Sequence, residues 1–101
     1  MTEYQSILLT KYKDDMIHYF KTHPEVFDEA YILANSDNQP YSWRSAWLLG
    51  NCLEKNDNRI AQHIDEIICS IDGKSDGHQR ELIKILEKME LSREQEGKLL
   101  N

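Results

Sequence analysis

The feature that most constrains the fold is the spacing of apolar residues, which recur every three or four positions in one segment after another. This spacing places them along one face of an α-helix, whereas a half-buried strand needs alternation at every second position. Polar stretches rich in Asn, Asp, Gly and Pro separate the segments. The sequence therefore predicts an all-α chain of amphipathic helices joined by short loops.

Six helices are predicted from this spacing and from the residues that flank each segment. They cover about residues 3–23, with a kink near 13–14, then 25–34, 43–55, 58–71, 77–90 and 92–101. Pro24 ends the first helix because proline has no backbone N–H. Ser42 is placed to cap the third helix, and Ser92 with Gln95 forms a capping box before the sixth. The third helix is apolar nearly all round, so we expect it to be central.

The helices recur in pairs, which predicts structural repeats. A shift of 37 positions places Phe27, Ala30, Tyr31 and Ala34 on Ile64, Ile67, Ile68 and Ile71, and a shift of 36 places Ala46, Trp47, Leu49 and Leu53 on Leu82, Ile83, Ile85 and Met89. An ordinary helical bundle is the alternative, since amphipathic helices give some matches by chance. We interpret residues 1–101 as one helical-repeat domain. The ending on two leucines favours a boundary drawn through a longer array over a frayed helix end.

The segment from Asp37 to Gly50 resembles the first helix of a HEAT-like repeat. The family pattern has an Asp in the preceding loop, an Arg entering the helix, then Ala and Leu-Gly, and this chain has Asp37, Arg44, Ala46 and Leu49-Gly50 there. Asp76, Arg80 and Leu86 echo the pattern, with Glu87 in place of Gly. The resemblance implies a right-handed armadillo-type α-α superhelix of about five to six helices, in which Asp37, Arg44, Asp76 and Arg80 tie adjacent repeats together. Tetratricopeptide and ankyrin signatures are absent.

The charge balance argues against nucleic acid as a partner. Eighteen acidic and twelve basic residues give a net charge of -6, which repels a phosphate backbone unless the basic residues cluster on one face. Lys and Arg are spread along the sequence. No apolar run is long enough for a signal peptide or a membrane span, so we expect a cytoplasmic protein whose partner is another protein rather than nucleic acid or a membrane.

No catalytic or cofactor-binding motif is present, so the sequence predicts a protein that is not an enzyme and needs no cofactor. Asp15 with His18, and His63 with Glu66, each place a carboxylate and an imidazole three residues apart on one helix. Two ligands do not make a metal site, because stable sites in proteins use three or four protein ligands. We therefore interpret both pairs as surface residues and predict no metal.

Thiols and aromatic residues each allow a structural and a functional interpretation. Cys52 and Cys69 lack metal-type spacing and are expected to be reduced. Packing of Cys69 against a neighbouring helix is favoured over a reactive thiol. Tyr41, Trp43 and Trp47 cluster at the start of the third helix and would form a peptide or base platform if exposed, but core packing is favoured for both tryptophans.

A solenoid of helix pairs presents the polar side of its second helices as a concave binding face. Here we assign to that side six polar residues: Glu25, Asp28, Glu29, Gln62, Asp65 and Glu66. Such an acidic face suits a basic segment of another protein, which predicts a scaffold or adaptor. The alternative is that this charged face is only solvated and binds nothing.

An enzyme is the alternative to a scaffold. HEAT-like proteins include glycosylases for alkylated DNA, which use aromatic, Asp and Arg residues in a basic groove. The net charge of -6 argues against such an enzyme.

Overall fold

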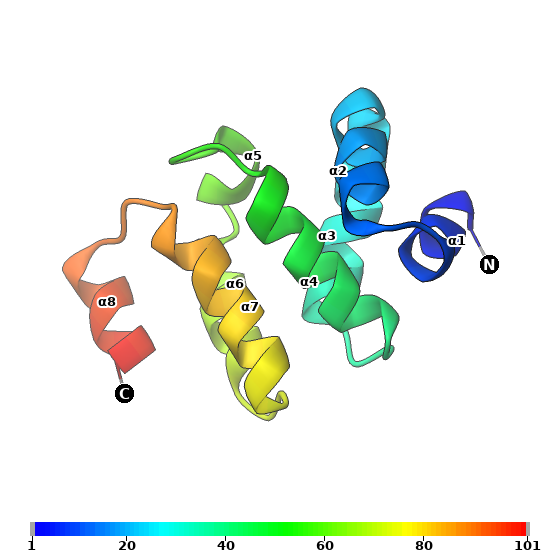
Figure 1. Cartoon of the computed structure of the whole chain (residues 1–101). Coiled ribbons are helices and arrows are strands. Elements are labelled where there is room, and N and C mark those ends of the chain that lie inside the picture. The colour runs from blue at the N-terminus through cyan, green and yellow to red at the C-terminus, as the bar shows by residue number, and fades with distance from the viewer. Residues whose placement is uncertain (1, 101) are drawn as a thin grey trace.

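Helices make up about three quarters of residues 2–100, the part of the chain that this computed structural model describes (Figure 1). They are α1 (Glu3–Thr10), α2 (Lys13–Thr22), the 3-10 helix η1 (Pro24–Val26), α3 (Phe27–Asn35), α4 (Tyr41–Cys52), α5 (Asn58–Ala61), α6 (Ile64–Ile71), α7 (Asp76–Glu87) and α8 (Arg93–Leu100). This range contains no strand, as the apolar spacing predicts. Eight α-helices stand where six were expected, because two predicted helices are broken.

The first predicted helix is broken at Lys11 and Tyr12, whose backbones are extended, close to the expected kink. Its apolar residues lie four apart, and positions four apart drift by about 40° around an α-helix. A straight helix would therefore direct Tyr4 and Phe20 to nearly opposite sides. The break changes the direction of α2, so that the side chains of Tyr4 and Phe20 are both buried, while Tyr12 is 86% exposed. The fourth predicted helix is likewise divided, at residues 62–63, into α5 and α6.

The predicted cap of α4 is wrong. The helix begins at Tyr41, which places Ser42 inside its first turn, where the side chain is fully buried and its Oγ has no hydrogen-bond partner among residues 2–100. Gln39 does part of the capping instead, because its Oε1 accepts a hydrogen bond from the backbone N–H of Trp43 at 3.1 Å.

The capping box before α8 is confirmed. Ser92 Oγ accepts from the backbone N–H of Gln95 at 3.1 Å, and Gln95 Oε1 accepts from the backbone N–H of Ser92 at 2.9 Å. Asp57 similarly caps α5 by accepting from the backbone N–H of Arg59 at 3.0 Å. Local side-chain chemistry therefore determined these two helix starts.

The helices form two layers. In one layer α4 packs between α2 and α7, and in the other α3 lies against α6, which contacts α8 (Figure 1). Helix α4 also packs on α3 and on α1, which confirms it as the central helix. Its side chains at Ala46, Leu48 and Leu49 are completely buried.

The pairing of helices differs from the sequence interpretation. Because a short loop folds α4 back onto α3, and another folds α7 onto α6, the pairs are α3 with α4 and α6 with α7. Helices α3 and α6 are thus the first members of their pairs, and the HEAT-like segment 37–50 leads into a second member. The shifts of 36 and 37 residues relate corresponding helices of the two pairs.

Hydrogen bonds between adjacent units join residues about one repeat apart. The Tyr31 hydroxyl donates to Glu66, Ser70 Oγ donates to Asn35 Oδ1 at 2.7 Å, Lys74 Nζ to Asp37 Oδ1 at 2.6 Å, and Lys88 Nζ to the Leu53 carbonyl at 2.9 Å. The sequence separations are 35, 35, 37 and 35 residues. This regular separation is what stacked repeats require, since each unit contacts its neighbour through equivalent positions.

We predict that Gly77→Ala displaces the Trp43 ring. A Cβ at Gly77, in the first turn of α7, would lie 2.5 Å from Trp43 Cζ2, which is closer than van der Waals contact allows. In a Trp47→Phe background, where Trp43 is the sole tryptophan, the fluorescence emission should shift to longer wavelength as the ring moves into water. Gly97→Ala is the control, because nothing lies within 4 Å of its Cβ position in α8. It should leave the emission unchanged, and an unchanged emission in both variants would contradict the contact.

A second prediction concerns acid stability. Hydrogen bonds from the Arg59 guanidinium and backbone lower the pKa of Asp57 to about 2. A lowered pKa contributes stability that is complete above the unfolded value near 4 and is lost as the pH falls through about 2. Asp57→Asn keeps a capping side chain but removes the charge, and should lower the free energy of unfolding at neutral pH by about 1–2 kcal/mol.

Urea unfolding between pH 6 and about 2 measures this effect. The difference between the wild type and Asp57→Asn should shrink toward zero at the acid end. Asp28→Asn is the control, because that exposed side chain forms no hydrogen bond or ion pair with another residue of the range 2–100. A difference that persists at low pH would show that the charge of Asp57 is not the stabilising factor.

Candidate functional site

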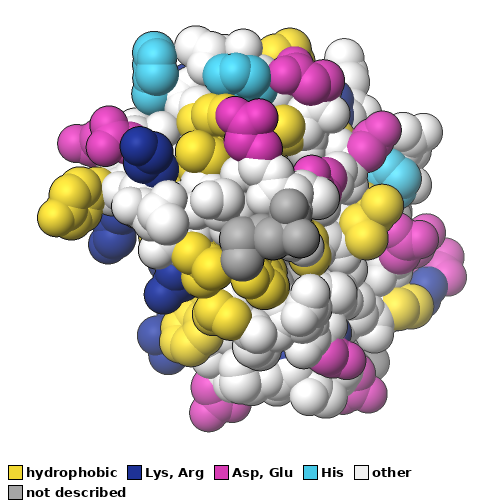
Figure 2. Space-filling view, turned by 90° about the vertical axis from the view of Figure 1, so that its right-hand side faces the viewer, with side chains coloured by type: hydrophobic (Ala, Val, Ile, Leu, Met, Phe, Trp, Pro, Cys, Tyr) yellow, Lys and Arg dark blue, Asp and Glu magenta, His cyan; other side chains and the backbone are white. Residues whose placement is uncertain are grey.

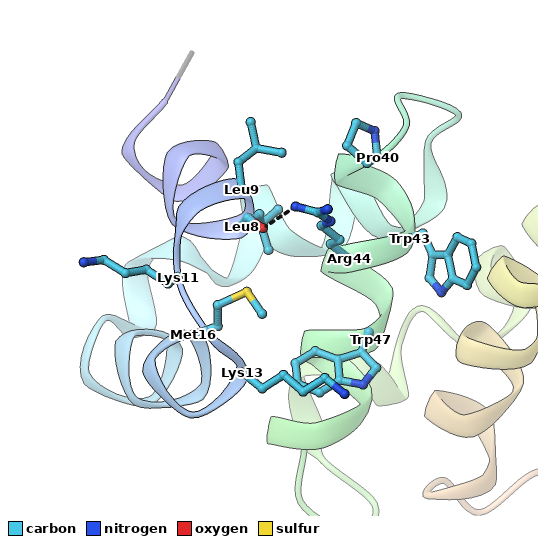
Figure 3. Close-up of a pocket in the computed structure, with 9 residues that line it drawn as sticks. All are labelled: Leu8, Leu9, Lys11, Lys13, Met16, Pro40, Trp43, Arg44 and Trp47. Carbon is cyan, nitrogen blue, oxygen red and sulfur yellow. Dashed lines mark hydrogen bonds between the residues drawn. The ribbon is translucent and has the colours of Figure 1, made fainter.

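A hollow of about 630 Å³ lies between α1, the linker that follows it, α2 and α4 (Figure 3). We call it the α1–α4 hollow. Residues from both walls line it: Leu8, Leu9, Lys11, Lys13 and Met16 on one side, and Pro40, Trp43, Arg44 and Trp47 on the other. The break between α1 and α2 opens this space, because it turns the two helices apart at the level of α4.

The floor of the hollow is apolar. Leu8 and Met16 are buried at its base, whereas Leu9 is 37% exposed on the wall. Trp47 is partly buried and packs against the core, so the prediction of core packing holds in part for this residue. The Nζ of Lys13 lies 5.4 Å from the centre of the Trp47 ring, within the range of a cation–π interaction.

Trp43 is not a core residue, which corrects the sequence interpretation. Its side chain is 47% exposed, and its ring points away from Arg44 toward α7, where it rests on Gly77 (Figure 3). The ring therefore lies between α4 and α7 and lines both the α1–α4 hollow and a smaller hollow at the loops near His78. The nearly all-apolar pattern of α4 hid this exposure, because pattern alone does not say how much of a large ring a neighbour covers.

Arg44 joins α4 to α1. Its Nη1 donates to the carbonyl oxygen of Leu8 at 3.0 Å, across 36 residues of sequence (Figure 3). That carbonyl belongs to the last turn of α1, where backbone oxygens lack partners within the helix and a positive charge is favourable. One hydrogen bond thus satisfies a helix end and fixes the guanidinium beside the hollow.

The other predicted inter-repeat residues lie in different surroundings. Asp37 pairs with Lys74 in the loop of the next unit, and the hydrogen bond and charge of Lys74 lower the pKa of Asp37. Asp76 and Arg80 are exposed on α7 and form no hydrogen bond or ion pair with another residue of the range 2–100. Contacts between units therefore exist at Asp37 and Arg44, while an inter-repeat role of Asp76 and Arg80 stays a prediction.

The α1–α4 hollow is locally basic in an acidic chain. Lys11, Lys13 and Arg44 line it, with the Lys11 side chain pointing outward (Figure 3), and no carboxylate is among its described lining residues. In Figure 2, Lys and Arg side chains gather along the left edge, which is the side that faces the viewer in Figure 1, and Asp and Glu lie mostly elsewhere. The net charge of -6 is therefore unevenly distributed. Sequence order did not reveal this cluster, because Arg44 reaches the two lysines only through packing.

The six residues predicted to bind a partner lie on the opposite layer. Glu25, Asp28 and Glu29 belong to η1 and α3, Gln62 follows α5, and Asp65 and Glu66 are on α6. None of them lines the α1–α4 hollow or the smaller hollow near His78. Their acidity has a local effect, since burial first, and then the charges of Glu3, Glu25 and Glu29, raise the pKa of Tyr19.

Three of these six residues already have hydrogen-bond partners. Glu29 accepts from Thr2, Glu66 from Tyr31, and Asp65 from Gln95 at 3.2 Å. Each bond links helices of different units, so these side chains help to join the repeats. Their role in binding a partner stays a prediction.

The two thiols differ in exposure. Cys69 is exposed on α6, so its predicted packing against a neighbouring helix is wrong: the helix buries Ile64 and Ile67, and its opposite side is uncovered. Cys52 is buried at the end of α4, and burial raises the pKa of its thiol. A raised pKa disfavours the reactive thiolate.

The imidazole and carboxylate pairs show no further ligands. Within residues 2–100, no group of three or more His, Cys, Asp or Glu side chains is arranged to hold a metal ion. His63 instead stacks on the ring of Tyr31, with 4.3 Å between ring centres, and its Nδ1 lies 3.8 Å from Glu66 Oε1. This cluster joins α3 to the start of α6.

Comparison with known proteins finds a family that the chain resembles. A family model described as a HEAT repeat domain matches residues 5–101, nearly the whole chain. Neither a curated protein nor a solved structure matches the chain significantly. Among the helices of residues 2–100, none has the length and apolar character needed to cross a membrane.

The Arg44 contact leads to a prediction about α1. Arg44→Met keeps the aliphatic part of the side chain but removes the donor to the Leu8 carbonyl. We expect the free energy of unfolding to fall by about 1 kcal/mol, because the lost bond is charged but partly solvated. Amide hydrogen exchange in α1 should accelerate more than in α7. Arg80→Met is the control at the equivalent repeat position, and an equal effect of both substitutions would argue against the α1 contact.

Proposed function

Because the chain belongs to the HEAT repeat family, we propose that it is a non-enzymatic scaffold that binds a segment of another protein in the α1–α4 hollow. The helical-repeat scaffold itself follows from the family match and from the stacked helix pairs. HEAT repeats commonly mediate contacts between proteins. The proposal adds the place of binding and the size of the ligand.

One observation carries the proposal: apolar and aromatic side chains surround an open hollow and are left partly exposed. Trp43, Leu9 and the nearby Tyr12 are among the few large apolar side chains of the range 2–100 that remain exposed. Aromatic residues and Arg are enriched at the centres of protein interfaces, where they account for most of the binding energy. The volume of about 630 Å³ suits one or two side chains of a peptide rather than the surface of a folded domain.

A basic segment bound to the acidic side chains of α3 and α6 is the second candidate. Glu25, Asp28 and Glu29 lie close together in sequence, in η1 and at the start of α3, and give this surface its negative charge. This surface is the weaker candidate, because three of its six predicted residues already bond to other units and none lines a described hollow.

The glycosylase alternative has less support. The α1–α4 hollow does bring aromatic side chains and Arg44 together, as that alternative expects. The described lining of the hollow contains no Asp or Glu, whereas the glycosylases of this kind use an Asp in their groove. A scaffold needs no such group.

A cytoplasmic location of the protein stays a prediction.

Selection of peptides from a random-sequence display library tests the proposal. We expect enriched peptides to bind the wild type and to lose at least about tenfold in affinity with Trp47→Ala, which removes the largest apolar wall of the hollow. Asp28→Lys, on the opposite layer, should leave their affinity within about twofold. Circular dichroism confirms that both variants are folded.

The alternative outcomes are distinguishable. Enriched peptides that are basic, and that lose affinity with Asp28→Lys but not with Trp47→Ala, would place binding on α3 and α6. A library that yields no binder, or binders insensitive to both substitutions, would contradict peptide binding at either surface.

A further inference from the structure

We propose that the α1–α4 hollow selects an acidic segment of another protein that carries one large apolar side chain; this inference rests on the proposed function. The occupant follows from the chemistry of the walls, which combine cations with an apolar floor. Neither the net charge of -6 nor the family match suggests an acidic ligand.

The charge of the hollow is one-sided. Lys13 extends along one wall toward Trp47 and Arg44 stands on the other, whereas the Lys11 side chain points away from the hollow (Figure 3). No described lining residue carries a negative charge. A segment lying between these walls therefore meets cations from two directions. Carboxylates on both sides of an anchoring residue would match this arrangement.

The apolar floor requires an anchor. Leu9, Met16 and Trp47 offer apolar surface at the base and on both walls of the hollow. A phenylalanine or leucine side chain in this space would be removed from water and would gain the corresponding hydrophobic free energy. A segment with charged side chains alone would leave the apolar floor exposed to water. We therefore expect an apolar anchor to be necessary for binding.

Two of the cations are held in place before a ligand arrives. The hydrogen bond to the Leu8 carbonyl fixes the Arg44 guanidinium at 3.0 Å but uses only one of its five N–H donors. Lys13 is placed above the Trp47 ring. Groups fixed in advance lose less conformational entropy on binding, which distinguishes this cluster from ordinary mobile surface lysines.

The carboxylates of α3 and α6 do not cancel this local charge. Most carboxylates of α3 and α6 lie on the opposite layer, at least about one helix diameter (~10 Å) away. At physiological ionic strength the screening length is about 8 Å, so their repulsion is weak at the hollow. Asp14 and Asp15 are closer, at the start of α2, but neither lines the hollow.

Single-stranded nucleic acid is the main competing ligand, because aromatic rings and cations also bind stacked bases. Such binding normally follows a positively charged groove along several nucleotides. Here only two cations, those of Lys13 and Arg44, face a single hollow in a chain of net charge -6. A short acidic peptide fits this limited cluster better, and nucleic acid becomes an outcome of the test.

The experiment uses the full chain and fluorescein-labelled synthetic peptides of equal length. The first peptide has a central phenylalanine flanked by glutamates. In the second, alanine replaces the phenylalanine; in the third, lysines replace the glutamates; in the fourth, serines replace them. A single-stranded oligothymidine serves as the nucleic-acid probe. Fluorescence anisotropy gives each dissociation constant at low and at physiological salt.

We expect the first peptide to bind most tightly and to weaken as the salt concentration rises. The double substitution Lys11→Glu/Lys13→Glu should weaken it about tenfold or more, since the attraction of Lys13 becomes a repulsion and the nearby charge at Lys11 is reversed as well. The control is Lys55→Glu, a single charge reversal at an exposed position that lines none of the described hollows, and a smaller than twofold effect is expected there.

Several results would overturn the inference without overturning the proposed function. They are equal binding of the serine peptide, tighter binding of the lysine peptide, or no loss with the double substitution, provided that Trp47→Ala still abolishes binding. Tighter binding of oligothymidine would assign the hollow to nucleic acid. A dimer in sedimentation experiments that the double substitution dissociates would make a second copy of the chain the occupant. Failure of every probe would overturn this inference, and the proposed function would fall with it only if the display library also yields no peptide that Trp47→Ala weakens.

Discussion

The whole arrangement depends on α4, because α1, α2, α3 and α7 all pack against it. A buried serine on α4 holds two of these helices against it. Ser45 Oγ donates a hydrogen bond to the Ala30 carbonyl at 2.7 Å and accepts one from the Tyr4 hydroxyl at 2.7 Å. One small side chain thus joins α4 to α3 and α1. Its small volume also permits close approach of the helices, while the hydrogen bonds satisfy polar atoms that would otherwise be costly to bury.

The sequence predicted those features that depend on local spacing. The all-helical fold, the central position of α4, the loops and the Ser92 capping box follow from apolar periodicity and from side chains that bond to nearby backbone. The repeat shifts also identified equivalent helices. Each of these signals lies within one segment or compares two segments, and none requires knowledge of which helices touch.

The features that the sequence did not predict depend on packing between distant segments. The helix pairing, the exposure of Trp43 and Cys69, and the meeting of Arg44 with Lys13 all follow from how the layers stack. His78 is a further case, since no local pattern indicates that it is fully buried and that its Nε2 forms a hydrogen bond with the Ala34 carbonyl at 2.7 Å. The break after α1 was expected only as a kink, although it opens the hollow.

The Trp43 ring has a consequence for the shape of the solenoid. Because it rests directly on the α7 backbone at Gly77, it acts as a spacer of fixed thickness between successive second helices. The curvature of a helical solenoid results from the small rotation between one unit and the next. The width of an indole ring therefore limits how far the first turns of α4 and α7 can bend toward each other.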